Sequence, residues 1–212
     1  MKLLLRFFYI IFLIATISAC AFGNRHTYHD TVAEVDATGT IAIAVTSHDQ
    51  RDYVISGNKK PIFVGLQRGG YGNPFDVLTD SGDPLAQDMT ISVVISLSKK
   101  GFQAIPVSSS HLEDQQSLIS RMKGTKAERF LIFTIYEWKS DTYQNTALIY
   151  DVNATIMNAN EVILGQSKIK GRDNLGGSFM NPPAYAKKAI PNVFREKIEI
   201  LLNKEEILNA LQ

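Results

Sequence analysis

The fold is decided by the stretch Phe130-Leu131-Ile132-Phe133-Thr134-Ile135-Tyr136-Glu137-Trp138. It is dominated by branched and aromatic side chains, which favour β-strands. Its first half is apolar on both faces, as in strands that are covered on both sides. The stretch therefore predicts the central strand of a sheet.

Two further strands are predicted after this one. Residues 145–157 carry apolar side chains on one face and polar ones on the other, namely Leu148, Tyr150, Val152, Ala154 and Ile156 against Asp151, Asn153 and Thr155. The turn Asn158-Ala159-Asn160 leads into residues 162–171, which return as the next strand. The pattern predicts a three-stranded antiparallel meander with one face in water.

Strands and helices are predicted to alternate before the central strand. Residues 40–47, 53–56 and 102–107 are expected to form strands, and two helices are expected to begin at Asp83-Pro84 and at the capping-box spacing from Ser110 to Glu113. At the C-terminal end an apolar stripe every fourth residue predicts a helix, with Pro191 as a kink or new start and Asn203 as the cap of a last short helix. The order is β-α-β-α-β-β-β-α. We expect an α/β (α+β) two-layer sandwich with a mixed sheet, a C-terminal antiparallel meander and helices on one face.

The beginning of the chain predicts a lipoprotein precursor. Lys2 and Arg6 precede an apolar run over residues 7–17, which ends in Ile17-Ser18-Ala19-Cys20. The run is shorter than the about 20 residues that a membrane-spanning helix needs, and small residues before the cysteine suit a signal peptidase. We expect a signal peptide over residues 1–19, a lipid on Cys20, a flexible tether over 20–38 and one periplasm-facing domain over 39–212. The alternatives are a buried helix or an ordinary secretory signal.

Composition excludes several kinds of chemistry. Without Lys2 and Arg6, 20 of the 22 basic residues remain against 21 acidic ones, a formal charge of −1 that gives no long-range attraction for nucleic acid. The single cysteine allows neither an intramolecular disulfide nor a cysteine metal site. His26 and His29 have metal-ligand spacing, but we expect them to be exposed tether residues. Phosphate-loop, nucleophile-elbow and zinc-protease motifs are absent, so we expect no cofactor, no metal and no enzyme.

Two glycine-rich segments are candidates for a binding surface. Residues 63–77 and 170–183 each combine an arginine, a glycine pair, an aromatic residue and an Asn-Pro. The candidate residues are Arg68, Gly69, Gly70, Tyr71 and Asn73 in the first and Arg172, Asp173, Asn174, Gly176, Gly177 and Phe179 in the second. Arginine can fork onto a carboxylate or phosphate, and exposed aromatic rings can anchor a partner. The alternative is that both are long loops packing on their own domain.

Trp138 and Tyr143, at the end of the central strand, are the remaining candidates. A tryptophan with a nearby tyrosine and charged groups can line a groove for a glycan or peptide. The alternative is that this tryptophan, the only one in the chain, plugs the end of the core.

Three blocks of the chain resemble a widespread group of uncharacterised proteobacterial lipoproteins. They are Val64-Gly65-Leu66-Gln67-Arg68-Gly69-Gly70, Glu137-Trp138-Lys139-Ser140-Asp141 and Gly171-Arg172-Asp173-Asn174-Leu175-Gly176-Gly177-Ser178-Phe179. More remotely, the lipobox and Asp49-Gln50-Arg51 after the first strand are similar to the YajG lipoprotein family. The resemblance implies a periplasm-facing domain on a lipid anchor, and Ala21 after the cysteine favours the outer membrane by similarity to the enterobacterial sorting rule. It implies no activity and no catalytic residues.

These observations lead to a functional hypothesis with two alternatives. We expect an outer-membrane lipoprotein that acts as a non-catalytic binding or assembly module and docks a periplasmic or envelope protein through the Arg68 and Arg172 segments. The first alternative is a peptidoglycan or glycan binder that uses Tyr71, Trp138, Tyr143 and Phe179. A hydrolase is the second.

Overall fold

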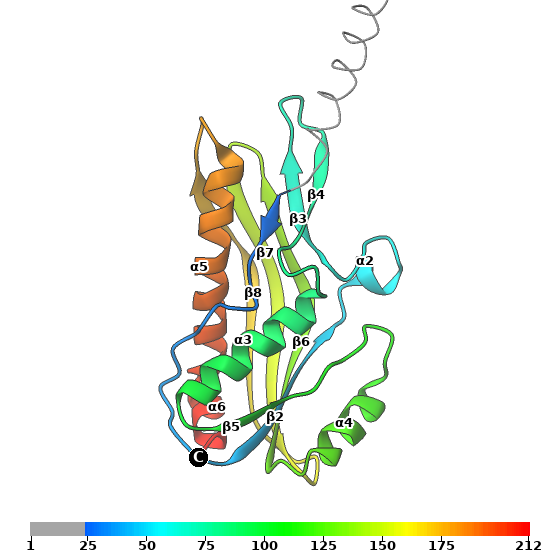
Figure 1. Cartoon of the computed structure of the whole chain (residues 1–212), viewed down its shortest axis with the longest axis vertical. Helices are drawn as coiled ribbons and strands as arrows, with labels where there is room; N and C mark the ends of the chain where they lie inside the picture. Colours follow the sequence, from blue (N-terminus) through cyan, green and yellow to red (C-terminus); the bar gives the residue numbers. More distant parts are fainter. Residues whose placement is uncertain (1–23) are drawn as a thin grey trace, which may run out of the picture.

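The computed structural model describes residues 24–212, so the predicted signal peptide and Cys20 lie outside the described residues. The described chain forms one mixed sheet of eight strands with helices packed against it (Figure 1). The strands are β1 (Arg25–His26), β2 (Ala42–Asp49), β3 (Phe63–Arg68), β4 (Pro74–Thr79), β5 (Gln103–Pro106), β6 (Arg129–Thr142), β7 (Asn145–Asn158) and β8 (Ile163–Gly177). The helices are α2 (Asp52–Ile55), α3 (Leu85–Lys99), α4 (Gln115–Gly124), α5 (Pro182–Leu202) and α6 (Glu205–Ala210).

Strand β6 organises the sheet, as the sequence predicted. Along one edge its first half runs parallel to β2 and its second half parallel to β3. Along the other edge it pairs antiparallel with β7, which pairs with β8. The outer neighbours on the first side are β5 beside β2, and β4 then β1 beside β3. The predicted antiparallel meander is confirmed, with the apolar side chains of β7 facing the core.

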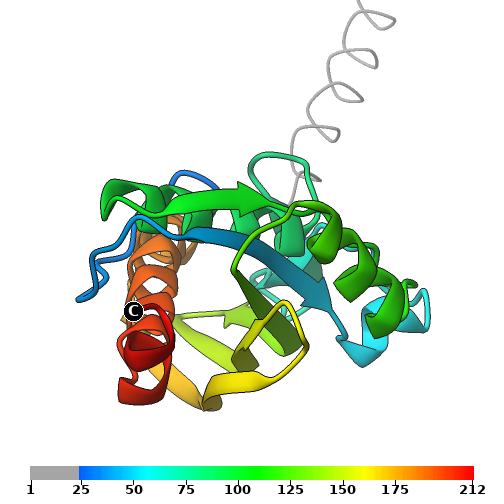
Figure 2. The same cartoon turned by 90° about the horizontal axis from the view of Figure 1, so that it is seen from below.

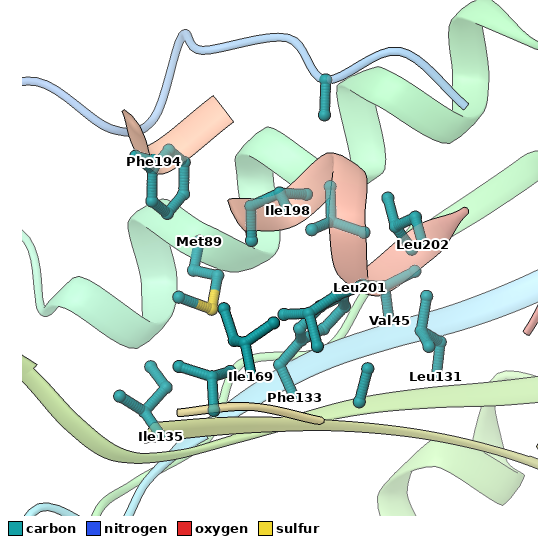
Figure 3. Close-up of a cluster of buried hydrophobic side chains, with 14 of the residues drawn as sticks. Val45, Met89, Leu131, Phe133, Ile135, Ile169, Phe194, Ile198, Leu201 and Leu202 are labelled. Atoms are coloured by element: carbon teal, nitrogen blue, oxygen red, sulfur yellow. The ribbon is translucent and has the colours of Figure 1, made fainter. Parts of the chain in front are cut away.

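The larger core lies between one face of the sheet and α3, α5 and α6. Residues from β2, β6 and β8, such as Val45, Phe133 and Ile169, meet Met89 of α3 and Phe194 to Leu202 of α5 (Figure 3). The sheet curls, so that α5 and α6 close one side of it (Figure 2). This architecture confirms the predicted α+β class with a mixed sheet.

Helix α4 departs from the prediction that all helices share one face. Its Leu118, Ile119 and Met122 form a second cluster with Phe130 and Ile132 of β6, on the opposite face of the sheet. The physical reason is the double apolar character of the first half of β6, since both of its faces need cover. Further along the sheet, the second face is left open and polar.

Residues 24–38, predicted as a flexible tether, are instead packed onto the domain. Tyr28 and Val35 are buried, and β1 pairs in parallel with β4. The side chain of Asn203, predicted to cap the last helix, binds this segment: it donates to the Glu34 carbonyl and accepts from the Asp36 amide, each at 2.9 Å. His26, expected to be exposed, is buried as well.

Three local predictions were also wrong, and at Pro191 one of two alternatives is excluded. Residues 53–56 lie in helix α2 and its end rather than in a strand, and the glycine-rich segment after them forms the β3–β4 hairpin rather than a loop. The cap of α4 is Asp114, whose carboxylate accepts the Ser117 amide at 2.9 Å. Helix α5 begins at Pro182 and continues through Pro191, so of the predicted kink or new start the new start is excluded. None of the helices in residues 24–212 is long and apolar enough to cross a membrane.

Candidate functional site

The two glycine-rich segments meet at one end of the sheet, where they form a cavity of about 530 Å³. Strand β3 contributes Arg68 from its last position, β8 contributes Arg172 and Asn174, and the β6–β7 turn closes the cavity between them. The lining residues are Arg68, Asp141, Tyr143, Gln144, Asn145, Ala147, Arg172 and Asn174. We call this cavity the Arg68–Arg172 pocket. Of the predicted binding residues, it brings together Arg68, Tyr143, Arg172 and Asn174.

The two arginines of the pocket have different environments. Arg68 donates from Nε and Nη2 to the two carboxylate oxygens of Asp141, both at 2.8 Å. This forked pair with Asp141 raises the pKa of Arg68 above its usual value. Arg172 is exposed and takes part in none of the ion pairs formed by residues 24–212. The guanidinium of Arg172 is therefore the pocket cation that is free to meet an anionic or polar group.

The walls of the pocket are held by contacts between distant segments. The Tyr143 hydroxyl donates to the Gly70 carbonyl at 3.3 Å, which joins the β6–β7 turn to the β3–β4 hairpin. At Gly177 the chain passes so close to that turn that a Cβ atom would collide with the Gln144 carbonyl. Gly176 has a φ of +82°, a conformation that favours glycine. The second glycine pair therefore allows two backbones to touch at the edge of the pocket.

Trp138, predicted as a surface candidate, is completely buried and does not belong to the binding surface. Its ring lies edge-on to Phe194, with centroids 5.5 Å apart, and its indole N–H donates to the Tyr28 hydroxyl at 3.4 Å. The reason is the irregularity of β6 between Ile135 and Glu137, where the register with β7 shifts by one residue and turns Trp138 to the same face as Phe133, the face that α5 covers. The alternative interpretation, a tryptophan that plugs the core, is the one the structure supports.

Asp173 also points away from the pocket. Its carboxylate pairs with Lys197 of α5 at 2.6 Å and accepts the Tyr150 hydroxyl at 3.2 Å. Burial alone would lower the pKa of Lys197, but the Asp173 carboxylate and the Tyr150 hydroxyl together outweigh burial and raise that pKa. Asp173 therefore fastens β8 to α5.

The other candidates lie around the pocket rather than in it. Gly69 and Asn73 close the turn of the β3–β4 hairpin, where the Gly69 amide donates to the Asn73 carbonyl at 2.9 Å. Tyr71, at the tip of that hairpin, and Phe179, after β8, are almost fully exposed. Neither aromatic ring lines the pocket.

A second polar cavity, which the sequence analysis missed, lies on the open face beside α4. It has a volume of about 210 Å³, and its lining includes His48 of β2, Gln50 directly after that strand and Glu113 before α4. The Gln50 amide and the His48 Nε2 lie 2.9 Å apart, and partial burial lowers the pKa of His48. The rule that sites form at the carboxyl ends of parallel strands could have drawn attention to it. Within residues 24–212, no group of three or more His, Cys, Asp or Glu side chains is arranged to hold a metal ion.

Comparison with known proteins gives similarity of fold only. No family model and no curated protein matches the chain. A Xanthomonas campestris protein of the DUF330 family aligns over 84% of this chain and 92% of its own, at 15% identity and a TM-score of 0.43. The PelC dodecamer from Paraburkholderia phytofirmans aligns over 82% of this chain and 96% of its own, at 11% identity and a TM-score of 0.40. Lipoprotein GNA1162 from Neisseria meningitidis aligns over 74% and 99%, at 11% identity and a TM-score of 0.29. None of the three is named as a YajG protein, so that remote resemblance stays a prediction, and these likenesses carry no argument about function.

Proposed function

We propose that this protein is a lipid-anchored lipoprotein of the bacterial outer membrane that binds a periplasmic or envelope protein without catalysing a reaction. The observation that carries the proposal is the Arg68–Arg172 pocket. Two segments about a hundred residues apart in the chain build one polar recess, in which Arg172 is unpaired. An arginine fork in such a recess suits a carboxylate or another polar group on a partner.

The open face of the sheet extends this surface beyond the pocket. Asp151, Asn153 and Thr155 of β7 and Lys168 and Lys170 of β8 lie beside one another there, and both lysines pair with Asp151 at 3.4 and 2.9 Å. The Asn153 side-chain oxygen is buried there and has no hydrogen-bond partner among residues 24–212. A polar face with such an unused acceptor suits a partner that brings a donor.

The lining of the pocket favours binding over chemistry. It consists of arginines, an aspartate, amide side chains, a tyrosine and an alanine. Charged and amide groups of this kind recognise polar ligands, whereas nucleophilic catalysis needs a nucleophile beside a base. The lining therefore supports the proposed binding module over the hydrolase alternative.

Affinity capture from cross-linked cells tests the proposal. Arg172→Ala should reduce recovery of an envelope protein at least several-fold, because the free cation of the pocket is lost. Arg195→Ala is the matched control, since Arg195 is an exposed arginine on α5 that faces a different groove. Equal recovery with both variants would contradict the proposed surface.

Sedimentation with purified cell wall separates the glycan alternative from this proposal. With Trp138 buried, Tyr143 is the aromatic residue that remains in the pocket. A glycan binder would sediment with peptidoglycan and lose this on Tyr143→Ala. We expect the protein to stay in the supernatant.

A further inference from the structure

The most exposed apolar side chains of residues 24–212 gather at one end of the domain. Among the large hydrophobic residues, Tyr71, Met180 and Phe179 have the highest relative exposures, at 103%, 88% and 84%. Tyr71 lies at the tip of the β3–β4 hairpin, and the other two lie between β8 and α5. Both connections point the same way, away from the C-terminus (Figure 1). They form two apolar tips on either side of the Arg68–Arg172 pocket.

The N-terminal segment enters the domain beside these tips. The Asn24 carbonyl accepts the Leu78 amide at 3.2 Å, and the Asn24 side chain donates to the Pro183 carbonyl at 2.9 Å. One contact is on β4 and the other on the first turn of α5. Asn24 is thus fixed between the two elements that follow the apolar tips.

Chain length then limits the distance between the domain and Cys20. Four peptide links join Cys20 to Asn24 and span at most about 14 Å. Strand β1 is parallel to β4, and the four residues from Leu78 back to Pro74 cover about 13 Å toward the hairpin tip. The greatest distance of Cys20 beyond Asn24 is therefore comparable with the distance that β4 covers toward the hairpin tip.

We propose that this end of the domain docks on the lipid bilayer, with Tyr71, Phe179 and Met180 in contact with its surface. The inference rests on the proposed lipidation of Cys20. Acyl chains on its sulfur would hold the bilayer within the short distance from Asn24 that the four peptide links allow. Tyrosine favours the headgroup region because its ring is apolar and its hydroxyl is polar. The phenylalanine and methionine side chains lose their contact with water when they enter the interface. Arg172, exposed between the tips, faces the phosphate layer.

Site-directed fluorescence in vesicles tests the docking. The full chain is produced with its lipid, purified, and inserted into vesicles of phosphatidylethanolamine and phosphatidylglycerol that contain nitroxide-labelled lipid. Phe179→Cys and Tyr71→Cys are each labelled with an environment-sensitive fluorophore. A lipidated Cys20 has no free thiol and the chain has no other cysteine, so the label goes to the new site alone.

The control is Val162→Cys, at the β7–β8 turn. Val162 is exposed but lies at the far end of β7, about 45 Å from the β6–β7 turn. We expect several-fold stronger quenching at positions 71 and 179 than at 162. Equal, weak quenching at all three positions in a chain whose mass shows the lipid would overturn the docking and leave the anchor intact. A free Cys20 thiol in the mature chain would overturn both.

Discussion

Replacing Tyr28 with alanine tests whether residues 24–38 belong to the folded domain. The Tyr28 ring is fully buried and lies edge-on to Phe194 and Trp138, with centroid distances of 5.0 and 6.3 Å. Truncating a buried aromatic ring of this kind costs about 3–5 kcal/mol, because the loss of burial and the cavity both count. The same truncation in a flexible tether would leave the free energy of unfolding almost unchanged.

Three variants separate the contribution of the Tyr28 ring from that of its hydroxyl and from that of an exposed position. Tyr28→Ala should lower the free energy of unfolding by about 3–5 kcal/mol. Tyr28→Phe removes only the hydroxyl, which accepts the Trp138 indole N–H, and should cost about 1 kcal/mol. Asp30→Ala, an exposed position in the same segment, should stay within about 0.5 kcal/mol of the unchanged protein.

Urea unfolding of a soluble form spanning residues 24–212 measures these differences. Trp138 is the only tryptophan in the chain and touches Tyr28, so its fluorescence reports the loss of this contact directly. A loss below about 0.5 kcal/mol for Tyr28→Ala would refute the packing of the N-terminal segment. It would also mean that Asn24 is not held in place, and the proposed bilayer docking depends on its being held.

Three further predictions concern the core and the pocket. Arg51→Met should cost about 3–5 kcal/mol in urea unfolding, because it leaves the buried carboxylate of Asp49 unpaired, and a cost below about 1 kcal/mol would contradict this. Gly177→Ala should displace the β6–β7 turn and weaken partner capture, whereas Gly70→Ala, where a Cβ meets open space, should leave capture unchanged. Burial lowers the pKa of His26 to about 4, so the folded state binds fewer protons than the unfolded state between pH 6.5 and 4. The contribution of neutral His26 to the free energy of unfolding is therefore complete above pH 6.5 and falls by about 3 kcal/mol as the pH drops to 4. The free energy of unfolding of His26→Asn, measured across this pH range, should lack that fall.

The sequence predicted those parts of the fold whose pattern is local. The double apolar character at the start of β6 indicated a central strand, and the alternation along β7 showed which side chains face the core. Tyr28 gave no such pattern, because its neighbours Trp138 and Phe194 are more than a hundred positions away. The β3–β4 hairpin was missed for a related reason: its glycine pair is typical of a loop, and its pairing with the second half of β6 is a long-range contact.

The site was predictable in its residues but not in its arrangement. Arg68 and Arg172 were selected for their chemistry, and they share a pocket because β3 and β7 pair with opposite edges of β6 while β8 pairs with β7. The local sequence pattern of these strands does not indicate that strand order. Trp138 was chosen for its type, yet its side of the strand is set by the register shift in β6 after Ile135, which the sequence pattern does not reveal.

The packed N-terminal segment changes how a partner can reach the protein. A flexible tether of 19 residues would let the domain sample many distances from the membrane, on a scale of about 5–6 Å times the square root of its length. With the chain fixed from Asn24 onward, only a few residues separate the domain from Cys20. In the proposed docking on the bilayer, the Arg68–Arg172 pocket opens beside the lipid headgroups. A protein partner that uses both the pocket and the open sheet face must therefore itself lie against the membrane or extend a segment along it.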